Sequence, residues 1–302
     1  MLLQSLRQLI TLKASEDAQG DSSMGGHLPT VMELLIGQCD ADDEGVRSMV
    51  AECLGRLALI APAHVLPALK AMLTKDAPEA RATVVFSLKF TITDKAPMKE
   101  LAACITDFLL LLKDPEIMVR RAALTTLNSA THNKPGLIRP VLRTDWLLPA
   151  LYGETVYKPD LVRTVSLGPF QHKVDDGAEL RKLSLACMDT LFDKCADKLD
   201  TSTFLLHLQE RLSDELDDMK QAAYQLLCKL AVREPFFVRE VPPRPVPQTL
   251  SLARRSDCLQ RGRQRAPDTE QQCAGAGAGL ACRPHFSGAQ EKAKGQRLSA
   301  RC

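Results

Sequence analysis

A cation that follows an acidic turn recurs five times along the chain, each time with apolar residues four and seven positions after it. The turns read DDEGVR, DAPEAR, DPEIMVR, DDGAELR and DELDDMK, and their cations are Arg47, Arg81, Arg120, Arg181 and Lys220. The apolar residues that follow are, in chain order, Ala51 and Leu54, Val85 and Leu88, Leu124 and Leu127, Leu185 and Met188, and Tyr224 and Leu227. Positions four and seven share one helical face, so each motif predicts an amphipathic helix.

A second amphipathic run precedes each acidic turn. The runs are LPTVMELLIGQC, HVLPALKAMLT, MKELAACITDFLLLLK, IRPVLRTDWLLPALY and TSTFLLHLQERL. Each unit is therefore expected to form two antiparallel helices joined by a short turn, whose Asp caps the second helix by accepting hydrogen bonds from its free N–H groups. Helix pairs that repeat about every 40 residues are typical of HEAT-like proteins. The sequence thus predicts an all-α, HEAT-like α-solenoid.

One interval between the motifs is too long. Successive cations are 34, 39, 61 and 39 residues apart, and the surplus lies between Tyr152 and Asp176. There LVRTVSLGPFQHKV, residues 161–174, is rich in strand-favouring residues, and Gly168 and Pro169 suit a turn. We expect one β-hairpin inserted in a loop of the solenoid, where insertions leave the packing of neighbouring repeats intact and often serve binding.

Composition divides the chain into four parts. Residues 1–26 are expected to form a partial repeat helix and a polar loop, 27–135 HEAT-like repeats, 136–234 the C-terminal repeats with the hairpin, and 235–302 a tail. The tail holds 12 Lys or Arg against 5 Asp or Glu, whereas residues 1–234 hold 27 against 32. Because this basic tail is rich in Pro, Gly and Arg and has no sustained apolar period, we expect it to be disordered.

The N-terminal sequence and the spacing of the cysteines indicate the cellular compartment of the protein. The first residues lack the small-residue cleavage site of a secretory signal, and no window is apolar for the length of a membrane span. The cysteines occur singly without CxxC pairs, which argues against structural zinc and for reduced thiols. We predict a protein of the nucleus and cytoplasm, with buried cysteines in the helical apolar patterns at Cys39, Cys53, Cys104, Cys187 and Cys228.

The inserted segment and its surroundings carry a family resemblance. The stretch LLPALYGETVYKPDLVRTVSLGPFQHKVDDGAELRKLSLACMDTLFDKCADKLD resembles the C-terminal region of the cullin-associated, neddylation-dissociated proteins, also described as TATA-binding-protein-interacting proteins. The blocks VAECLGRLALI, FTITDK and LKDPEIMVRRAALTTLNSATHNKPGLIR are similar to the preceding repeats of that family, nearer to its second, muscle-enriched paralogue. The resemblance ends near residue 234, where the family continues with further helices and this chain turns to its basic tail.

The resemblance implies a function and a binding site. It implies a scaffold that binds the N-terminal domain of a cullin and regulates assembly and substrate-receptor exchange of cullin-RING (SCF-type) ubiquitin ligases. In that family the hairpin occupies the adaptor site, which places the partner contacts here at Val165, Leu167, Gly168, Pro169, Phe170 and His172. The residues alone leave two interpretations open, since Val165 and Phe170 can instead fold back onto their own repeat.

The same residues leave other functions to consider. A transcription cofactor that binds the TATA-binding protein and a generic helical-repeat adaptor remain alternatives. An enzyme is not expected, because no histidine accompanies a recognisable nucleophile and orienting carboxylate. GAGAGL, at 275–280, lacks the strand and helix of a phosphate loop, and DADDEGVRSMVAE has Ala51 where a calcium loop needs Glu.

These exclusions predict no cofactor, no metal and no small-molecule substrate. The tail's arginine cluster lacks interleaved aromatics, so nucleic acid is not favoured as a partner.

The last predicted helix, from about Asp217 to Val232, would normally be covered by a following unit. It is therefore expected to expose Leu226, Leu227 and Leu230.

Overall fold

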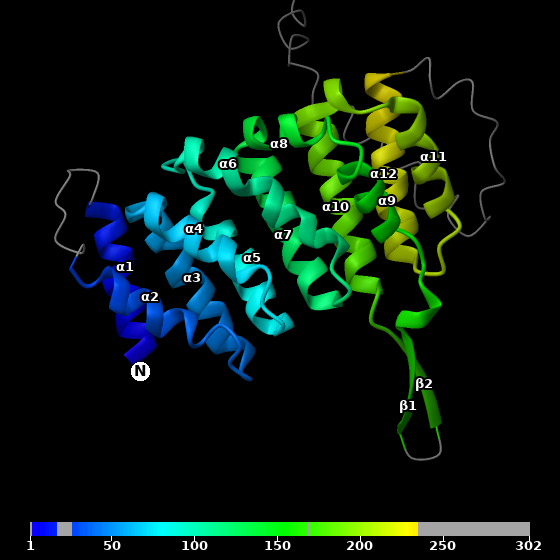
Figure 1. The fold of residues 1–302 in the computed structure, drawn as a ribbon. Helices are drawn as coiled ribbons and strands as arrows, with labels where there is room; N and C mark the ends of the chain where they lie inside the picture. The colour runs from blue at the N-terminus through cyan, green and yellow to red at the C-terminus, as the bar shows by residue number, and fades with distance from the viewer. Residues whose placement is uncertain (1, 17–25, 168–169, 235–302) are drawn as a thin grey trace, which may run out of the picture. The chain divides into compact units, whose positions relative to one another are not determined.

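The computed structural model describes residues 2–16, 26–167 and 170–234. Over this part the chain is a stack of antiparallel helix pairs from which one β-hairpin projects (Figure 1). The predicted HEAT-like α-solenoid with an inserted hairpin is confirmed. The predicted disordered tail at 235–302, the polar loop at 17–25 and the turn residues Gly168 and Pro169 lie outside the described residues.

The second helices of the units form one layer of the stack. In this layer α3 packs against α5, α5 against α7, α7 against α10, and α10 against α12, while α1 packs against α3 at the start. These helices are α1 (Leu2–Glu16), α3 (Glu44–Ile60), α5 (Pro78–Thr91), α7 (Ile117–Asn133), α10 (Ala178–Cys195) and α12 (Asp217–Arg233). These helices supply about half of the buried hydrophobic residues, and the predicted positions four and seven after the cation are buried in α3, α5, α7 and α10.

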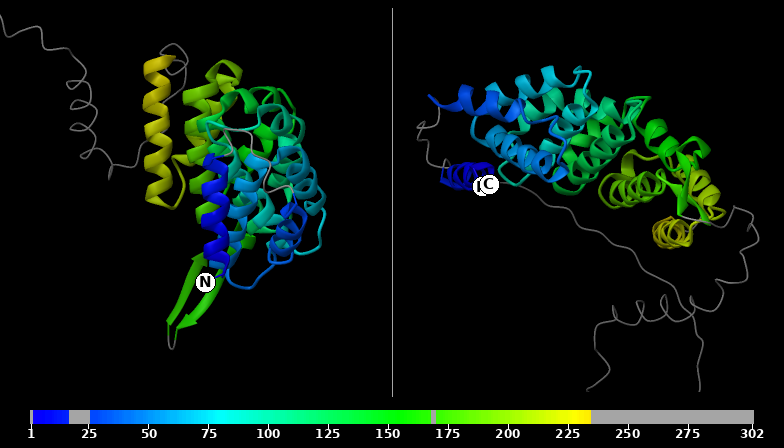
Figure 2. Two further views of the ribbon diagram at one scale, coloured as in Figure 1. Left: turned by 90° about the vertical axis from the view of Figure 1, so that its left-hand side faces the viewer. Right: turned by 90° about the horizontal axis from the view of Figure 1, so that it is seen from below.

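The first helices of the units form the other layer, in which α4 packs against α6 and α6 against α8. They are α2 (Leu28–Ile36), α4 (Pro62–Met72), α6 (Met98–Leu109), α8 (Pro135–Val141), α9 (Leu147–Glu154) and α11 (Thr201–Arg211). Three short 3-10 helices complete the described elements: η2 (Leu110–Lys113) follows α6, η3 (Pro159–Leu161) precedes β1, and η4 (Ala196–Lys198) follows α10. Figure 2 shows the two layers from two further sides.

The fourth unit departs from the prediction of a single first helix. The run IRPVLRTDWLLPALY divides into α8 and α9 instead of forming one helix. Pro140 lies inside α8 and brings no N–H, and the chain then turns as the N–H groups of Arg143 and Thr144 bond back to the carbonyl oxygens of Pro140 and Val141. The hydroxyl of Thr144 also donates to the Val141 carbonyl, so the polar residues close α8 before α9 begins.

Adjacent second helices approach closely where the sequence supplies small residues. A Cβ on Gly55 of α3 would lie 2.2 Å from the carbonyl oxygen of Ser87 in α5. The hydroxyl of Thr91 reaches back and donates to the Gly55 carbonyl at 3.0 Å. Thr126 of α7 makes the corresponding bond to the carbonyl of Val85 at 2.8 Å. Glycine and threonine thus let the helix backbones pack directly against each other.

The acidic turns cap their helices less uniformly than predicted. Asp43 is the N-cap of α3 and accepts from the N–H groups of Gly45 and Val46. Asp114, Asp175 and Asp214 instead each accept from the N–H group two residues further on, ahead of or at the helix start. The expectation that the turn Asp caps the second helix is therefore confirmed at α3 and wrong at α5, α7, α10 and α12. At the last three helices the carboxylate closes the turn itself.

Two expectations about α12 are corrected by the structure. Leu226 and Leu230, expected to be exposed, are buried in the core against α10 and α11, and Leu227 is half-buried. The helix turns its polar residues outward, so the apolar stripe lies one position away from the one read from the motif. Cys228 lies on the outward face and is exposed, whereas Cys39, Cys53, Cys104 and Cys187 are buried as predicted.

The hairpin consists of β1 (Val162–Leu167) and β2 (Phe170–Asp175), one residue later at each end than predicted. It occupies the turn between α9 and α10, the place held in the other units by the short acidic turns. Both Figure 1 and the left view of Figure 2 show it extending beyond the ends of the helices. The long interval between Arg120 and Arg181 is thus accounted for by an insertion at one edge of the stack.

Candidate protein–protein interface

The strand register places the predicted contact positions on one face of the hairpin. Val165 pairs with His172 and Leu167 with Phe170 in the antiparallel ladder. Directly opposed residues point to the same side, as do residues two apart along a strand. The four positions therefore share a face, which also carries Arg163 and Val174 nearer the helices; we call it the 165/172 face. Gly168 and Pro169, the other predicted contacts, lie outside the described residues.

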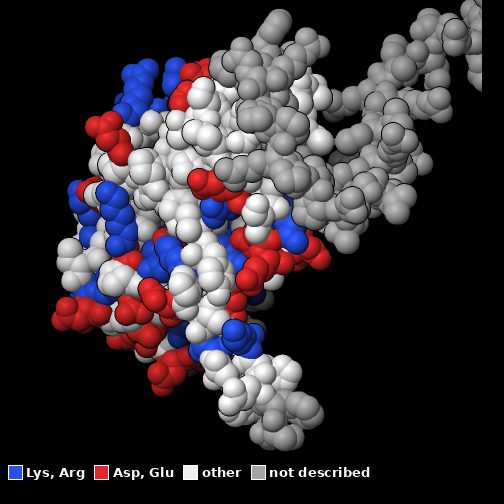
Figure 3. Space-filling view, turned by 90° about the vertical axis from the view of Figure 1, so that its right-hand side faces the viewer, with Lys and Arg blue, Asp and Glu red and all other residues white. Residues whose placement is uncertain are grey.

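The opposite face of the hairpin is polar. It carries Thr164 and Ser166 on β1 and Gln171 and Lys173 on β2, all of them exposed. Residues 164–172 contain no Lys, Arg, Asp or Glu, so the part furthest from the helices is uncharged. Figure 3 shows charged side chains where the hairpin leaves the stack and an uncharged surface beyond them. A two-faced, uncharged projection of this kind suits an apolar contact with another protein.

A repeated arginine explains how the ordinary turns are held. Arg47, Arg81 and Arg120 each donate from Nη1 to two backbone carbonyl oxygens, those of the residues six and five positions earlier, at 2.6 to 2.9 Å. The motif cation thus turns back and satisfies carbonyl groups of its own turn. Arg81 also reaches the next unit, where its guanidinium donates to both oxygens of Asp114 at 2.9 and 3.0 Å.

Arg181 uses the same position to hold the root of the hairpin. The acceptor is again the residue six positions earlier, but now Nη1 donates at 2.8 Å to the side-chain carboxylate of Asp175, the last residue of β2. The other oxygen of Asp175 accepts from the N–H of Gly177 at 2.9 Å. The side chain of Arg181 is 2% exposed, and its guanidinium carbon lies 5.3 Å from the ring centre of Tyr157.

The two strands are joined to the helices at a second point of the root. Arg163 donates from Nε to the carboxylate of Asp176 at 2.7 Å, and the N–H of Asp176 donates to the carbonyl of Leu161 at 3.0 Å. A Cβ on Gly177 would lie 3.1 Å from the Leu161 side chain. The end of β2 is therefore packed against the chain that leads into β1. Sequence reading identified Arg181 as a repeat cation but missed this role, which depends on a contact to the inserted segment.

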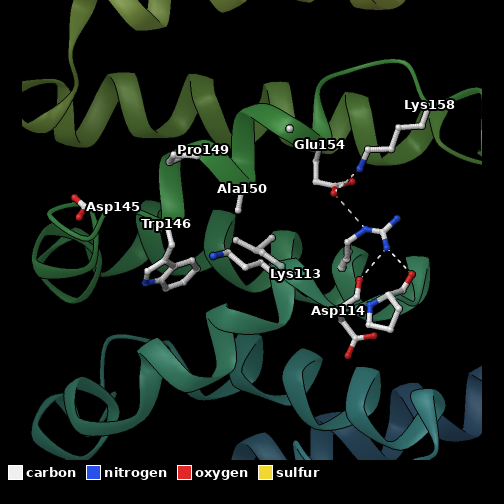
Figure 4. Close-up of a pocket in the computed structure, with 12 residues that line it drawn as sticks. Lys113, Asp114, Asp145, Trp146, Pro149, Ala150, Glu154 and Lys158 are labelled. Atoms are coloured by element: carbon white, nitrogen blue, oxygen red, sulfur yellow. Dashed lines mark hydrogen bonds and ion pairs between the residues drawn. The ribbon is translucent and has the colours of Figure 1, made fainter.

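A concavity of about 870 Å³ lies beside this edge, between the η2–α7 turn and α9. Figure 4 shows Trp146 beside Lys113, and Glu154 and Lys158 pointing toward each other. The ammonium group of Lys113 lies 5.7 Å from the Trp146 ring centre, and that of Lys158 lies 2.7 Å from Glu154. Arg120 reaches the same carboxylate at 3.3 Å. The carboxylate of Glu154 is therefore shared between two cations, and Lys113 lies over an aromatic ring.

The cysteines and the acidic residues of the described part of the chain bear on metal binding and nucleophilic chemistry. No cluster of three or more His, Cys, Asp or Glu that could hold a metal ion occurs among the described residues. Burial raises the pKa of Cys53 and of Cys104 to about 11, so both thiols stay protonated and are poor nucleophiles near neutral pH. None of the helices in residues 2–16, 26–167 and 170–234 has the length and apolar character that a membrane span needs.

Paired helices stacked in two layers around a continuous core define a helical-repeat protein, here with a hairpin in one inter-helix turn. The sequence profile of the TIP120 family, described as "TATA-binding protein interacting (TIP20)", matches residues 137–247 and so includes β1 and β2. Among solved structures, a designed armadillo repeat protein in complex with peptide (KR)4 aligns with a TM-score of 0.46 and 15% identity, over 74% of this chain and 90% of that chain.

Curated relatives give the more specific result. Cullin-associated NEDD8-dissociated protein 1 of Drosophila melanogaster is 42% identical over 234 residues, which are 77% of this chain and 18% of that protein. Cullin-associated NEDD8-dissociated protein 2 of Mus musculus is 39% identical over 233 residues, 76% of this chain and 19% of that protein. The chain is therefore a partial homologue of the cullin-associated NEDD8-dissociated proteins. It spans about a fifth of the length of these relatives.

Proposed function

We propose that this chain is a non-enzymatic scaffold segment that binds the N-terminal domain of a cullin and places its hairpin where a substrate-receptor adaptor would bind. By excluding the adaptor sterically, it would regulate assembly and receptor exchange of cullin-RING ubiquitin ligases. The relatives' names connect the family with cullins. Nearer relationship to the second paralogue stays a prediction, because relatives of both names match with similar identity.

The observation that carries the proposal is the two-faced hairpin. Its register sets the 165/172 face, with Val165, His172 and the positions of Leu167 and Phe170, apart from the polar face. Aliphatic and aromatic residues gathered at the centre of a contact supply most of its binding energy, while surrounding polar groups exclude water. The role of these residues as partner contacts stays a prediction that the register favours.

Preorganisation supports the same proposal. A two-stranded hairpin is marginally stable on its own in water, so a free loop of this sequence would lose conformational entropy on binding. Here Arg181 and Asp176 hold both strands at the root before any partner arrives. A hairpin that is already formed and directed away from the stack can enter a groove on another protein at a lower entropic cost.

A competition experiment tests the proposal. The purified chain is titrated into a complex of a cullin N-terminal domain with its adaptor, and release of the adaptor is measured. A variant with residues 164–173 replaced by a Gly-Ser linker of equal length should lose competition while its far-ultraviolet circular dichroism remains helical. A matched control replaces Val232, an exposed apolar residue of α12, by Ser and should compete like the wild type. Equal competition by the linker variant would refute the hairpin as the excluding element.

Binding to the TATA-binding protein is the second candidate function. It is favoured by one observation, the match of residues 137–247 to a family described as TATA-binding protein interacting. The same linker variant separates the two candidates. Capture of the TATA-binding protein that survives loss of the hairpin, together with no capture of the cullin domain, would support the second function and contradict the first.

A further inference from the structure

We propose that the turn between α11 and α12 is a two-point clamp, formed by Arg211 and Asp214, that fixes the direction in which the hairpin projects. The last helix pair then takes part in presenting the hairpin as well as in closing the core. The clamp consists of contacts within this chain and does not depend on a partner. Its consequence for partner binding rests on the proposed function.

The first point of the clamp holds the chain that enters the hairpin. Arg211, at the end of α11, donates from Nη1 to the backbone carbonyl of Thr155 at 2.6 Å. Both residues are buried, with Arg211 8% and Thr155 0% exposed. Thr155 directly follows α9 and begins the segment that leads to β1. The same two helices also meet where the rings of Tyr152 and His207 stack at 4.2 Å.

The second point holds the chain that leaves the hairpin. Asp214 lies 3.3 Å from Nε of Arg181, whose Nη1 is bonded to Asp175 at the end of β2. The side chains of Arg181 and Asp214 are 2% and 4% exposed, so the pair is screened from water. Asp214 is itself fixed, because its other oxygen accepts from the N–H of Leu216 at 2.9 Å. Asp175, Arg181 and Asp214 therefore form a chain of charges from β2 to the last unit, in which Arg181 and Asp214 are buried and Asp175 is partly exposed.

The two points are close together on the same turn. The N–H of Asp214 donates to the carbonyl of Arg211 at 3.2 Å, so the residues that hold the two legs are joined by a backbone hydrogen bond. A hairpin held on one leg can pivot about that leg, whereas one held on both legs is restrained in direction. A shift of the α11–α12 turn would therefore move both legs at once.

Hydrogen exchange of the full chain tests the clamp without any partner. Arg211→Met removes the first point of the clamp, Asp214→Asn removes the second, and the combined variant removes both. The Asn side chain keeps an oxygen that can accept from the N–H of Leu216. Asp217→Asn is the matched control, because Asp217, the first residue of α12, has a side chain that is 89% exposed and pairs with Lys220. Arg211→Lys keeps a cationic donor for Thr155. Circular dichroism and exchange in α3 and α5 report on the rest of the fold.

In the combined variant the amides of residues 162–167 and 170–175 should exchange about tenfold faster or more. Arg211→Met leaves the buried Thr155 carbonyl without its donor, and Asp214→Asn removes the charge that faces the buried Arg181. Exchange in α3 and α5 should stay close to wild type in every variant. The Asp217→Asn control should keep wild-type exchange in the hairpin as well. Arg211→Lys should retain most of the wild-type protection of the hairpin amides. Unchanged hairpin exchange in the combined variant, or an equal increase throughout the helices, would overturn the clamp.

Affinity for a cullin N-terminal domain, measured on the same variants, separates the clamp from the proposed function. Affinity should fall about tenfold in the combined variant although no hairpin residue is altered. Recovery in Arg211→Lys relative to Arg211→Met would tie that effect to the bond with Thr155. Faster hairpin exchange with unchanged affinity would leave the clamp standing and contradict docking through the hairpin. Unchanged exchange would refute the clamp whatever the affinity.

Discussion

The turn before α7 and the turn before α10 occupy the same place in their units and are held by the same arginine position. Before α7, Arg120 closes a short turn by donating to the backbone carbonyls of Asp114 and Pro115. Before α10, the turn has grown into a hairpin, and Arg181 donates to the carboxylate of Asp175. The comparison teaches that a solenoid can accept an insertion without losing its repeat contact, provided that a side chain replaces the carbonyl acceptor.

The insertion also changes the contact between neighbouring units. Arg81 pairs with Asp114 and Arg181 with Asp214, each an acid in the turn of the following unit. Arg120, whose following turn carries the hairpin, pairs instead with Glu154 at the end of α9. An ion pair between an arginine of one unit and an acid of the next is thus kept at the insertion, with Glu154 as the acceptor.

The largest effect is expected at the arginine that distinguishes the two turns. Arg181→Met should lower the free energy of unfolding by about 3–5 kcal/mol, because it leaves the buried carboxylate of Asp214 and the partly buried carboxylate of Asp175 without their cation. Denaturant unfolding followed by circular dichroism measures the change. Arg139→Met is the control, since its pair with Asp197 is exposed and such a pair contributes about 0–1 kcal/mol. Equal losses in the two variants would contradict the role given to Arg181.

A second, intermediate effect tests the ordinary repeats away from the hairpin. Gly55→Ala should lower the unfolding free energy by about 1–3 kcal/mol, because the added methyl group meets the Ser87 carbonyl and the two helix backbones must separate. Gly153→Ala is the matched control in α9, where an added Cβ meets nothing within 4 Å and the better helix propensity of Ala helps. A destabilisation of Gly153→Ala equal to that of Gly55→Ala would show that close packing is not the cause.

A smaller effect depends on pH and concerns the helices of the clamp. Burial lowers the pKa of His207, as does Arg211 to a smaller extent, while Glu210 raises it. The unfolded chain therefore takes up the proton first, near its ordinary pKa of about 6.5. The stability that the neutral ring provides is present above that pH and is lost as pH falls from it toward the lowered folded pKa.

His207→Phe keeps a ring for the stack with Tyr152 and removes the titration. The wild type should lose more thermal stability than this variant between pH 7.5 and pH 5.5, by a fraction of the roughly 1.4 kcal/mol that one unit of pKa represents. Melting temperatures at both pH values give the comparison. Parallel losses in the two proteins would show that His207 does not contribute to the acid sensitivity.

The sequence predicted the repeats well because their signal is local. The acidic turn, the cation and the apolar positions of each motif lie within a few residues of one another. Their spacing located the second helices and the insertion. The division into α8 and α9 was missed because the apolar period continues through Pro140, Thr144 and Asp145. The burial of Leu226 and Leu230 was missed because these leucines were expected to face a following unit, whereas they pack inward against α10 and α11.

The candidate site was predictable only in part for the same reason. Alternation along the strands and the resemblance to the family pointed to residues 161–174, and the register now places Val165 and His172 on a common face. The supports of the hairpin lie far away in sequence: Arg211 and Thr155 are separated by 56 residues, and Arg181 and Asp214 belong to different units. No local pattern marks such pairs, because a buried arginine reads in the sequence like any surface cation.

The most direct measurement compares two neighbouring strand residues that lie on opposite faces of the hairpin. Val165→Lys and Thr164→Lys add the same charge one residue apart, and both should leave the melting temperature nearly unchanged. Affinity for a cullin N-terminal domain, measured by titration calorimetry, should fall about tenfold or more for Val165→Lys, since a charge would be buried in an apolar contact. It should stay within about threefold of wild type for Thr164→Lys. Equal affinities for the two variants would contradict docking through the 165/172 face.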